Sequence, residues 1–365
     1  MKNWQANKII WIITFLISKT TSTKMPASKP RVILGLMTCG PDEAVGARIT
    51  DPDQFNNLLE HFQKRGYKEL DTARVYLRGN QEAFTKSARW VEKGFALATK
   101  VKYPNAPGDN NADGVFESVE TSLKELGTDH VDDRTVRFAD TLEALDKLYK
   151  QGKFTRLGLS NFTAFEVAEI VLTAKYNNWI RPTVYQAMYN VLARSIEPEL
   201  IPACRRYGLD IVVYNPLAGG LLSGKIKSKD VVPTSGRFSG PSGTLGSMYR
   251  GRYFKDRNFE ALQLIEDGAK EHGITTIEAA LRWLVHHSAL KTKNGANDGF
   301  IIGVSSLEQL ESNLDFFEKG PLPDELVKKL DEAWLIAKLD MANYWHGDIQ
   351  YSYHTREALF APNAK

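Results

Sequence analysis

Three polar residues near the ends of predicted strands have the types needed to handle a proton. Asp71 ends the short apolar run at residues 69–72, Tyr76 follows it, and Lys100 lies near the end of the next run, residues 96–101. A buried ammonium beside a phenol lowers the pKa of the phenol, while the carboxylate balances the ammonium. The alternative is a structural ion pair between Asp71 and Lys100, with Tyr76 as an ordinary rim aromatic. The spacing alone leaves both interpretations open.

Short polar side chains also follow later strands. Ser160 and Asn161 end one apolar run and Gln186 lies near the end of the next, which suits hydrogen bonds to a carboxamide such as that of nicotinamide. Residues 215–225 form a Gly-rich turn that can approach a pyrophosphate closely. Without further motifs, capping of strand ends explains the first three residues equally well.

After the last predicted strand, the chain begins a helix whose N-terminus is suited to bind an anion. Ser305 and Ser306 open a helix that carries Gln309 and Asn313. Free backbone N–H groups at a helix N-terminus after the eighth strand are the usual phosphate site of an α/β barrel. The alternative is a simple N-cap supported by Glu308.

An alternation of strands and helices must position these groups. Apolar runs that predict buried parallel strands lie at residues 32–37, 96–101, 155–159, 183–188, 211–214 and 300–304. Helical spacing occurs at residues 51–65, 112–126, 142–150, 165–176 and 259–272, and glycines follow several of these helices. With no linker dividing it, this alternation predicts one closed (β/α)8 TIM barrel of the α/β class. A Rossmann domain would need GxGxxG after the first strand, where this chain has GLMTCGP.

Composition limits the partners. The chain has 365 residues, 42% of them hydrophobic and 25% charged, with a formal net charge of +3. This balance is too even to hold nucleic acid by bulk charge, so we expect a small-molecule partner. The two cysteines, Cys39 and Cys204, provide neither a metal site nor a disulfide framework. We therefore expect no metal and a cytoplasmic main body.

The N-terminal region has a different character. Residues 9–17 are apolar except for Thr14, and Lys2 and Lys8 precede them. This is typical of a secretory signal or anchor and is too short to span a bilayer. The alternative is an upstream extension ahead of an original start at Met25. Residues 1–30 are expected to be an N-terminal extension, 31–340 the barrel and 341–365 a tail near the active site.

From residue 31 onward, seven ordered motifs resemble the aldo-keto reductase superfamily, most closely its aflatoxin-aldehyde reductase branch. The motifs are ELDTARVY, ALATKV, RLGLSNF, VYQAMYN, YNPLAGGLLSGK, GRF and IIGVSSLEQLESNL. The resemblance implies a TIM barrel that binds extended NADPH and reduces a carbonyl substrate. It implies that Tyr76 is the proton donor, that Lys100 lowers the pKa of Tyr76, and that Asp71 holds Lys100.

The resemblance also assigns binding residues. The implied cofactor positions are Ser160, Asn161, Gln186, Asn215, Leu217, Gly219, Lys225, Arg237, Ser305, Ser306, Gln309 and Asn313. Lys225 and Arg237 match phosphate-pairing positions, which favours NADPH over NADH. Tyr249 and Arg252 match substrate-facing positions and favour a carboxylate-bearing substrate such as succinic semialdehyde, or a polar dicarbonyl. The alternative for these two is a solvated basic loop, and His346 stands where relatives tend to carry a carboxylate-reading Arg.

One expected segment is missing from the family pattern. After Gly127 the chain reads TDHVDDRTVRFADTL, about seven residues short of an apolar strand ending in Leu-His-Ala-Pro. The terminal His of that strand is the fourth member of the family's catalytic set, and His130 lies at the wrong end to replace it. We expect strand four to be short or disrupted around residues 130–132, with a weakened barrel wall, poor folding and impaired turnover.

Two functions follow from this sequence. The first is NADPH-dependent reduction of aldehydes, ketones or dicarbonyls, by a chain impaired by the gap or representing an aberrant splice or gene-model form of an active protein. The second is a non-catalytic protein that binds or senses the cofactor. The intact Tyr76 and Lys100 favour the reductase. A homodimer is a further expectation, and membrane contact is expected only through residues 9–17.

Overall fold

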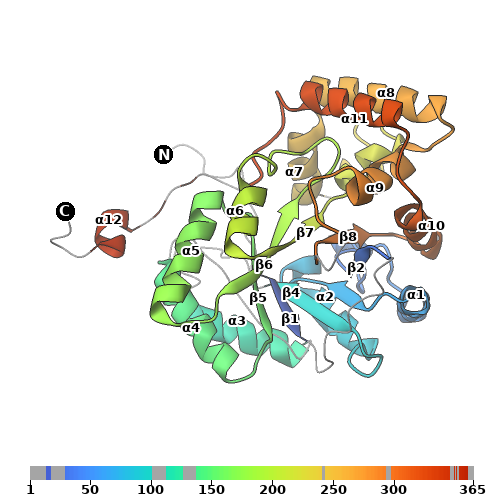
Figure 1. Ribbon diagram of the computed structural model, residues 1–365. Helices are drawn as coiled ribbons and strands as arrows, with labels where there is room; N and C mark the ends of the chain where they lie inside the picture. Colours follow the sequence, from blue (N-terminus) through green and yellow to red (C-terminus); the bar gives the residue numbers. More distant parts are fainter. Residues whose placement is uncertain are drawn as a thin grey trace, which may run out of the picture.

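The chain forms a closed barrel surrounded by helices (Figure 1). The computed structural model describes residues 14–17, 29–100, 112–125, 137–240, 243–292, 297–345, 349, 351 and 353–360. The strands are β1 (Thr14–Ile17), β2 (Arg31–Gly35), β3 (Glu69–Asp71), β4 (Ala96–Lys100), β5 (Arg156–Ser160), β6 (Pro182–Met188), β7 (Asp210–Tyr214) and β8 (Gly299–Gly303). Their order around the barrel is β1-β4-β3-β2-β8-β7-β6-β5. This confirms the predicted α/β barrel class.

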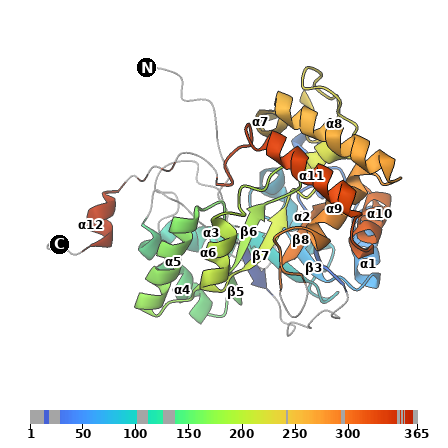
Figure 2. The same cartoon turned by 45° about the horizontal axis from the view of Figure 1, so that its top comes forward.

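Helices follow the strands and surround the barrel, and the short C-terminal helix lies apart from it (Figure 2). They are α1 (Pro52–Lys64), α2 (Asn80–Ser87), α3 (Ala112–Glu125), α4 (Phe138–Lys150), α5 (Ala164–Asn177), α6 (Leu200–Tyr207), α7 (Gly243–Tyr253), α8 (Asp256–Glu271), α9 (Thr276–His286), α10 (Leu307–Glu318), α11 (Asp324–Ala337) and α12 (Thr355–Leu359). Short 3-10 helices lie at η1 (Glu43–Val45), η2 (Tyr76–Gly79) and η3 (Ala218–Ser223). The last two carry loops of the candidate site.

Helix α1 illustrates why these segments fold as they do. The carboxylate of Asp51 accepts a hydrogen bond from the N–H of Asp53 at 2.7 Å, and Pro52 stands in the first turn. The side chains buried against the barrel recur with helical spacing: Phe55, Leu58, Leu59 and Phe62. The helix therefore buries one face and leaves the other in solvent.

The barrel has an outer and an inner core. Val32 and Leu34 of β2 belong to the large core between strands and helices. Ile33, between them in sequence, belongs to a small separate cluster with Val184, Val212 and Ile301. Side chains alternate across a strand, so this second cluster fills the barrel interior.

Strand β1 is the unexpected element. It runs antiparallel to both β4 and β5 and lies between them, whereas the other described strand pairs are parallel. The sequence predicted a weakened barrel wall between β4 and β5, and it predicted that residues 1–30 extend beyond the barrel. The structure differs on both points, because β1 fills this part of the wall. The predicted remnant of strand four, residues 130–132, lies outside the described residues. Within the described ranges, no helix is long and apolar enough to cross a membrane.

Described residues of the C-terminal tail pack at the start of α5. The hydroxyl of Tyr344 accepts a hydrogen bond from the N–H of Ala164 at 3.0 Å and donates to Glu199 at 3.2 Å. The hydroxyl of Tyr351 donates to Glu166 at 2.8 Å. The start of α5 follows the carboxyl end of β5, so this part of the tail lies at the strand ends where the site residues gather.

Candidate active site

Asp71, Tyr76 and Lys100 meet at the carboxyl ends of β3 and β4. The Lys100 ammonium forms an ion pair with the Asp71 carboxylate and donates a hydrogen bond to the carbonyl of Thr72 at 2.7 Å. Its Nζ lies 3.4 Å from the Tyr76 hydroxyl oxygen. Lys100 is fully buried and Tyr76 is half-buried. The ion pair and the phenol contact therefore exist together.

The backbone holds this arrangement in place. Beyond β3, the N–H of Thr72 donates to the carbonyl of Ala98 at 2.8 Å, and the N–H of Arg74 donates to the carbonyl of Lys100 at 2.7 Å. The ladder between the two strands thus continues past Asp71. It fixes the start of the loop that carries the phenol.

The turn at Tyr76 depends on a glycine that the sequence analysis did not identify. Leu77 and Arg78 have φ values of 50° and 56°, a left-handed conformation that costs about 1 kcal/mol or more for residues with a side chain. A Cβ atom at Gly40 would lie 2.2 Å from Cδ1 of Leu77. Gly40 therefore leaves room for the buried Leu77 side chain, which anchors the turn beside Tyr76.

A buried carboxylate supports the same loop. Glu82 is fully buried, pairs with Arg74, and accepts hydrogen bonds from Thr99 at 2.8 Å and Ser122 at 3.2 Å. These contacts connect the Tyr76 loop to β4 and α3. Burial raises the pKa of Glu82, against the hydrogen bonds and the charge of Arg74. The EAF segment looks like ordinary helix in sequence, so only the fold reveals this role.

Burial and nearby charges act on the pKa of the Tyr76 phenol. Burial raises the pKa of Tyr76 well above its ordinary value, the charge of Asp71 raises it further, and Arg237 lowers it. Burial lowers the pKa of Lys100, while Asp71 opposes that change. That Lys100 lowers the pKa of Tyr76 stays a prediction, and burial and the Asp71 carboxylate act in the opposite direction. The phenol therefore carries its proton at neutral pH, as a proton donor must.

Gln186 reaches the catalytic cluster from β6. Its side-chain amide donates a hydrogen bond to Oδ1 of Asp71 at 2.8 Å, while Lys100 pairs with Oδ2. Both carboxylate oxygens are thus engaged. Gln186 was expected at a cofactor amide, and the structure adds a positioning contact that strand-end patterns do not predict.

The ends of β5 and β7 are joined through side chains. Tyr214 donates a hydrogen bond from its hydroxyl to Oδ1 of Asn161 at 2.9 Å. Oγ of the neighbouring Ser160 is buried and has no hydrogen-bond partner among the described residues. Since buried hydroxyls are usually paired, Ser160 is available to an external polar group. Tyr214 was not among the predicted residues, although its place at the end of a strand was a usable signal.

The start of α10 is both capped and exposed. Oγ of Ser306 accepts a hydrogen bond from the N–H of Gln309 at 3.3 Å, and Oε1 of Gln309 accepts from the N–H of Ser305 at 3.0 Å. A hydrogen bond to Ser306 holds the pKa of Glu308 below its ordinary value. Asn313 is buried in the next turn of the helix. The capping interpretation is thus realised: side chains of the cap engage the N–H groups of Ser305 and Gln309, and an anion at this exposed helix start would replace those contacts.

The Gly-rich turn after β7 packs under an aromatic ring. Asn215 and Gly219 have φ values of 64° and 71°. The Tyr249 hydroxyl donates to Oδ1 of Asn215 at 3.3 Å, and a Cβ atom on Gly219 would lie 2.6 Å from two Tyr249 ring carbons. The remaining predicted positions of the turn are the half-buried Leu217 and the exposed Lys225.

Two arginines flank the same ring. The guanidinium carbons of Arg237 and Arg252 lie 5.4 and 5.7 Å from the centroid of Tyr249. Arg237 also reaches Sδ of Met37 at 3.4 Å, and its charge acts on Tyr76. The structure therefore brings Tyr249 and Arg252 together, and their role towards a substrate stays a prediction. Arg237, which was expected at the cofactor phosphate, lies beside the same Tyr249 ring.

The described chain places no histidine at Tyr76. The described histidines lie on α1, after α8, at the end of α9 and before α12: His61, His272, His286, His287 and His354. His130 and His346 lie outside the described residues. The acid and its supporting ion pair thus come together from residues of β3, β4 and the intervening loop.

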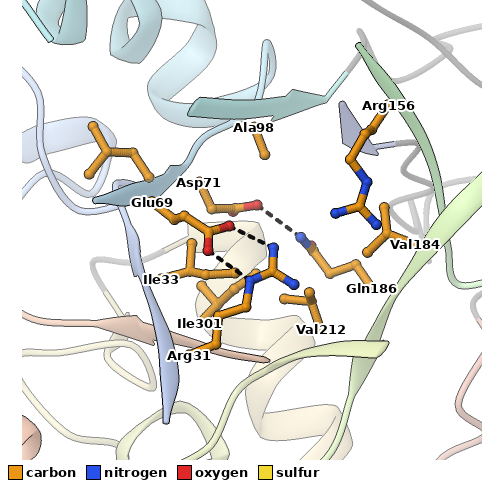
Figure 3. A pocket seen from close by; sticks show the side chains of 11 residues that line it. Arg31, Ile33, Glu69, Asp71, Ala98, Arg156, Val184, Gln186, Val212 and Ile301 are labelled. Carbon is orange, nitrogen blue, oxygen red and sulfur yellow. Dashed lines mark hydrogen bonds and ion pairs between the residues drawn. The ribbon is translucent and has the colours of Figure 1, made fainter. Parts of the chain in front are cut away.

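A small cavity lies inside the barrel below these groups (Figure 3). Its volume is about 30 Å³, enough for one or two water molecules. Arg31 pairs with Glu69 at 2.6 Å on one side, and Arg156 lies across from them. Asp71 and Gln186 form its upper boundary on the site side. This volume is too small for a cofactor or a carbonyl substrate.

A closed barrel with an acid and an ion pair at its carboxyl ends is the architecture of a barrel enzyme. The sequence profile of the aldo/keto reductase family matches residues 31–335, and this chain belongs to that family. It is 40% identical over 298 residues to an aldo-keto reductase of Pseudocercospora fijiensis, covering 79% of this chain and 100% of the relative.

Mammalian relatives show the same family membership. Aflatoxin B1 aldehyde reductase member 2 of Rattus norvegicus is 39% identical over 333 residues, covering 87% of this chain and 88% of the relative. Its counterpart in Homo sapiens is 40% identical over 336 residues, covering 87% and 90%. These relatives confirm the predicted resemblance to the aflatoxin-aldehyde reductase branch.

Proposed function

We propose that this protein reduces aldehydes, ketones or dicarbonyls to alcohols with NADPH. The observation that carries the proposal is the phenol of Tyr76 at the barrel mouth, whose hydroxyl oxygen lies 3.4 Å from the buried Lys100 ammonium. The family membership and the names of the aldehyde reductase relatives support the same reaction class.

Tyr76 is the proposed proton donor to the carbonyl oxygen. Lys100 orients the hydroxyl and supplies positive charge where negative charge develops on oxygen. Asp71 keeps Lys100 in place, and Gln186 keeps Asp71 in place. The loss of Asp71 or Lys100 would leave the other charge buried without its partner.

The residues at the ends of β5 and β6 fit a nicotinamide. NADPH, when bound, supplies the hydride that reaches the carbonyl carbon. The orphaned hydroxyl of Ser160, the amide of Asn161 and the remaining capacity of Gln186 match the donors and acceptors of a carboxamide. The half-buried Tyr214 ring suits packing against a planar ring.

The phosphate end of the cofactor is assigned to η3 and α10. We propose that Asn215, Leu217 and Gly219 border the pyrophosphate, and that Lys225 offers a charge. The proposed 2′-phosphate residues are Ser305, Ser306, Gln309 and Asn313, with Arg237 as a further cation. The exposed first turn of α10 supports this assignment, because its N–H groups favour an anion.

The substrate side is assigned to Tyr249 and Arg252. With Arg237 beside the same ring, the mouth carries two guanidinium groups, which suits carbonyl compounds with a carboxylate or several polar oxygens. We propose reduced turnover relative to a chain with a histidine at the end of strand four. The motif that would place such a histidine is missing from the sequence.

Replacing Tyr76 with Phe tests the function. We expect Tyr76→Phe to lower kcat for carbonyl reduction about 100-fold or more, because the acid is lost while the ring still packs. NADPH affinity, measured by fluorescence quenching, should stay within about twofold of the unmodified protein. Unchanged turnover in this variant would remove Tyr76 from the mechanism.

A further inference from the structure

The barrel is closed by β1, a strand that is not part of the repeating strand–helix units. Residues Thr14 to Ile17 pair one by one with Lys100 to Leu97 of β4. On the other side, Phe15 and Leu16 pair with Leu157 and Arg156 of β5. The remaining sheet neighbours of β4 and β5 are β3 and β6, so β1 joins two strands that would otherwise have open edges.

We propose that Thr14–Ile17 replaces the barrel strand expected between β4 and β5, and that the folded protein needs this segment to close its catalytic wall. From β2 to β4 and from β5 to β8, each strand is connected through helix to the next strand in the chain, which is its parallel neighbour in the barrel. Between β4 and β5 the chain instead passes through α3 and α4. The proposal does not depend on the reaction the protein catalyses.

The sequence explains why the N-terminal segment suits this place. A barrel strand is buried on both faces, so it reads as an apolar run. Thr14–Ile17 reads TFLI, within the apolar run of residues 9–17. Residues 126–136, between α3 and α4, contain three aspartates and an arginine. Placing such charges without partners in a buried strand is strongly unfavourable, whereas an apolar sequence such as TFLI is typical of a strand that is buried on both faces.

The antiparallel direction follows from the chain connection. Ile17 pairs with Leu97 near the amino end of β4, and β2 begins at Arg31 at the same end of the barrel. Residues 18–28 can span up to about 35 Å, and three strand spacings amount to about 15 Å. A parallel segment would leave the chain at the opposite end and require a return across the barrel.

The register connects this closure to the active site. Thr14 pairs with Lys100, so the start of β1 lies at the carboxyl edge of the barrel. Directly opposed residues of an antiparallel pair belong to the same face of the sheet. Removing β1 would expose the edge of β4 beside the Lys100–Asp71 ion pair. We therefore expect stability and catalysis to depend on this segment together.

The first test uses proline in the full chain. Leu16 is paired on both sides, so Leu16→Pro must remove a ladder hydrogen bond or force the strand apart. We expect its melting temperature to fall by about 5 °C or more, while the matched Leu16→Val variant stays within about 2 °C. Equal melting temperatures for the two variants would overturn the proposal.

The second test measures the pairing itself and does not require a destabilised variant. Leu16 and Ala98 are directly opposite, within the distance that a disulfide spans, so a Leu16→Cys/Ala98→Cys chain should cross-link under mild oxidation. The control chain carries Leu16→Cys with Val32→Cys on β2, which β3 and β4 separate from β1. Peptide mass spectrometry should find the 16–98 disulfide in the first chain only. If the first chain folds without this disulfide, or both cross-link alike, β1 does not occupy this place.

Discussion

At the residue scale, burial and opposing charges determine the pKa of the Tyr76 phenol. Burial and the Asp71 carboxylate both favour its neutral form, and Arg237 is the charge that opposes them. The neutral form is the one that can give a proton to a developing alkoxide. The structure therefore predicts a donor that works throughout the neutral range, and not one that needs a pKa near 7.

The ionisation of Tyr76 can be measured directly. Because its pKa is raised, the phenol should remain protonated as the pH rises to 10, the ordinary tyrosine value, and should ionise only above it. The measurement is the difference in tyrosinate ultraviolet absorbance between the unmodified protein and Tyr76→Phe during an alkaline titration. A tyrosinate signal from Tyr76 between pH 7 and pH 9 would contradict the assigned environment.

Arg237 has two possible roles, at the 2′-phosphate of the cofactor and at the substrate mouth. One variant distinguishes between them. If it pairs with the 2′-phosphate, Arg237→Ala should weaken NADPH binding by about 1.5 to 3 kcal/mol and leave NADH binding unchanged. Fluorescence titrations with both cofactors provide the comparison. If NADPH affinity is unchanged while KM for the carbonyl substrate rises, Arg237 belongs with Tyr249 and Arg252 at the substrate mouth, and its phosphate role is wrong.

At the scale of elements, η3 and α7 meet on one side of the mouth, where Gly219 approaches the Tyr249 ring closely. Gly219 has a φ of 71° and lies directly under the Tyr249 ring, whereas Gly220 has a φ of 101° with nothing near its missing Cβ. Both positions require a left-handed backbone, and only one of them touches the ring. The chain thus offers a matched pair of substitutions.

Alanine at these glycines should separate backbone strain from displacement of Tyr249. We expect both Gly219→Ala and Gly220→Ala to lower the melting temperature, because each costs about 1 kcal/mol in backbone strain, and Gly219→Ala to lower it further because of its clash with the Tyr249 ring. Only Gly219→Ala should also raise KM for the carbonyl substrate, by about tenfold, because its Cβ pushes the ring aside. Steady-state kinetics of both variants are the check, and equal KM values would mean that Tyr249 does not border the substrate.

At the scale of the whole molecule, much of the barrel could be predicted from local patterns. Apolar runs and helix-ending glycines indicated the strands and helices, and their repetition indicated closure. The meeting of Asp71 and Lys100 followed from the same logic, since neighbouring strand ends share one edge. Local periodicity is sufficient where each element packs against its neighbour in sequence.

The rest depended on distant contacts. The apolar run at residues 9–17 has the composition of a signal segment, and nothing local distinguishes that from a strand whose partners begin at residues 97 and 156. The bond from Gln186 to Asp71 spans the barrel interior. Arg237 lies on a loop, so its approach to Tyr249 depends on the path of that loop. Each of these features is fixed by tertiary packing.

The central claim is hydride transfer from NADPH to a carbonyl carbon with Tyr76 supplying the proton. The most direct measurement is a single turnover of the full chain with NADPH deuterated at the transferred position and a small aldehyde or vicinal dicarbonyl. Mass spectrometry of the alcohol should find deuterium on the former carbonyl carbon, and Tyr76→Phe should form this product about 100-fold or more slowly. Tight NADPH binding without deuterated alcohol would contradict the account and favour a non-catalytic cofactor-binding protein.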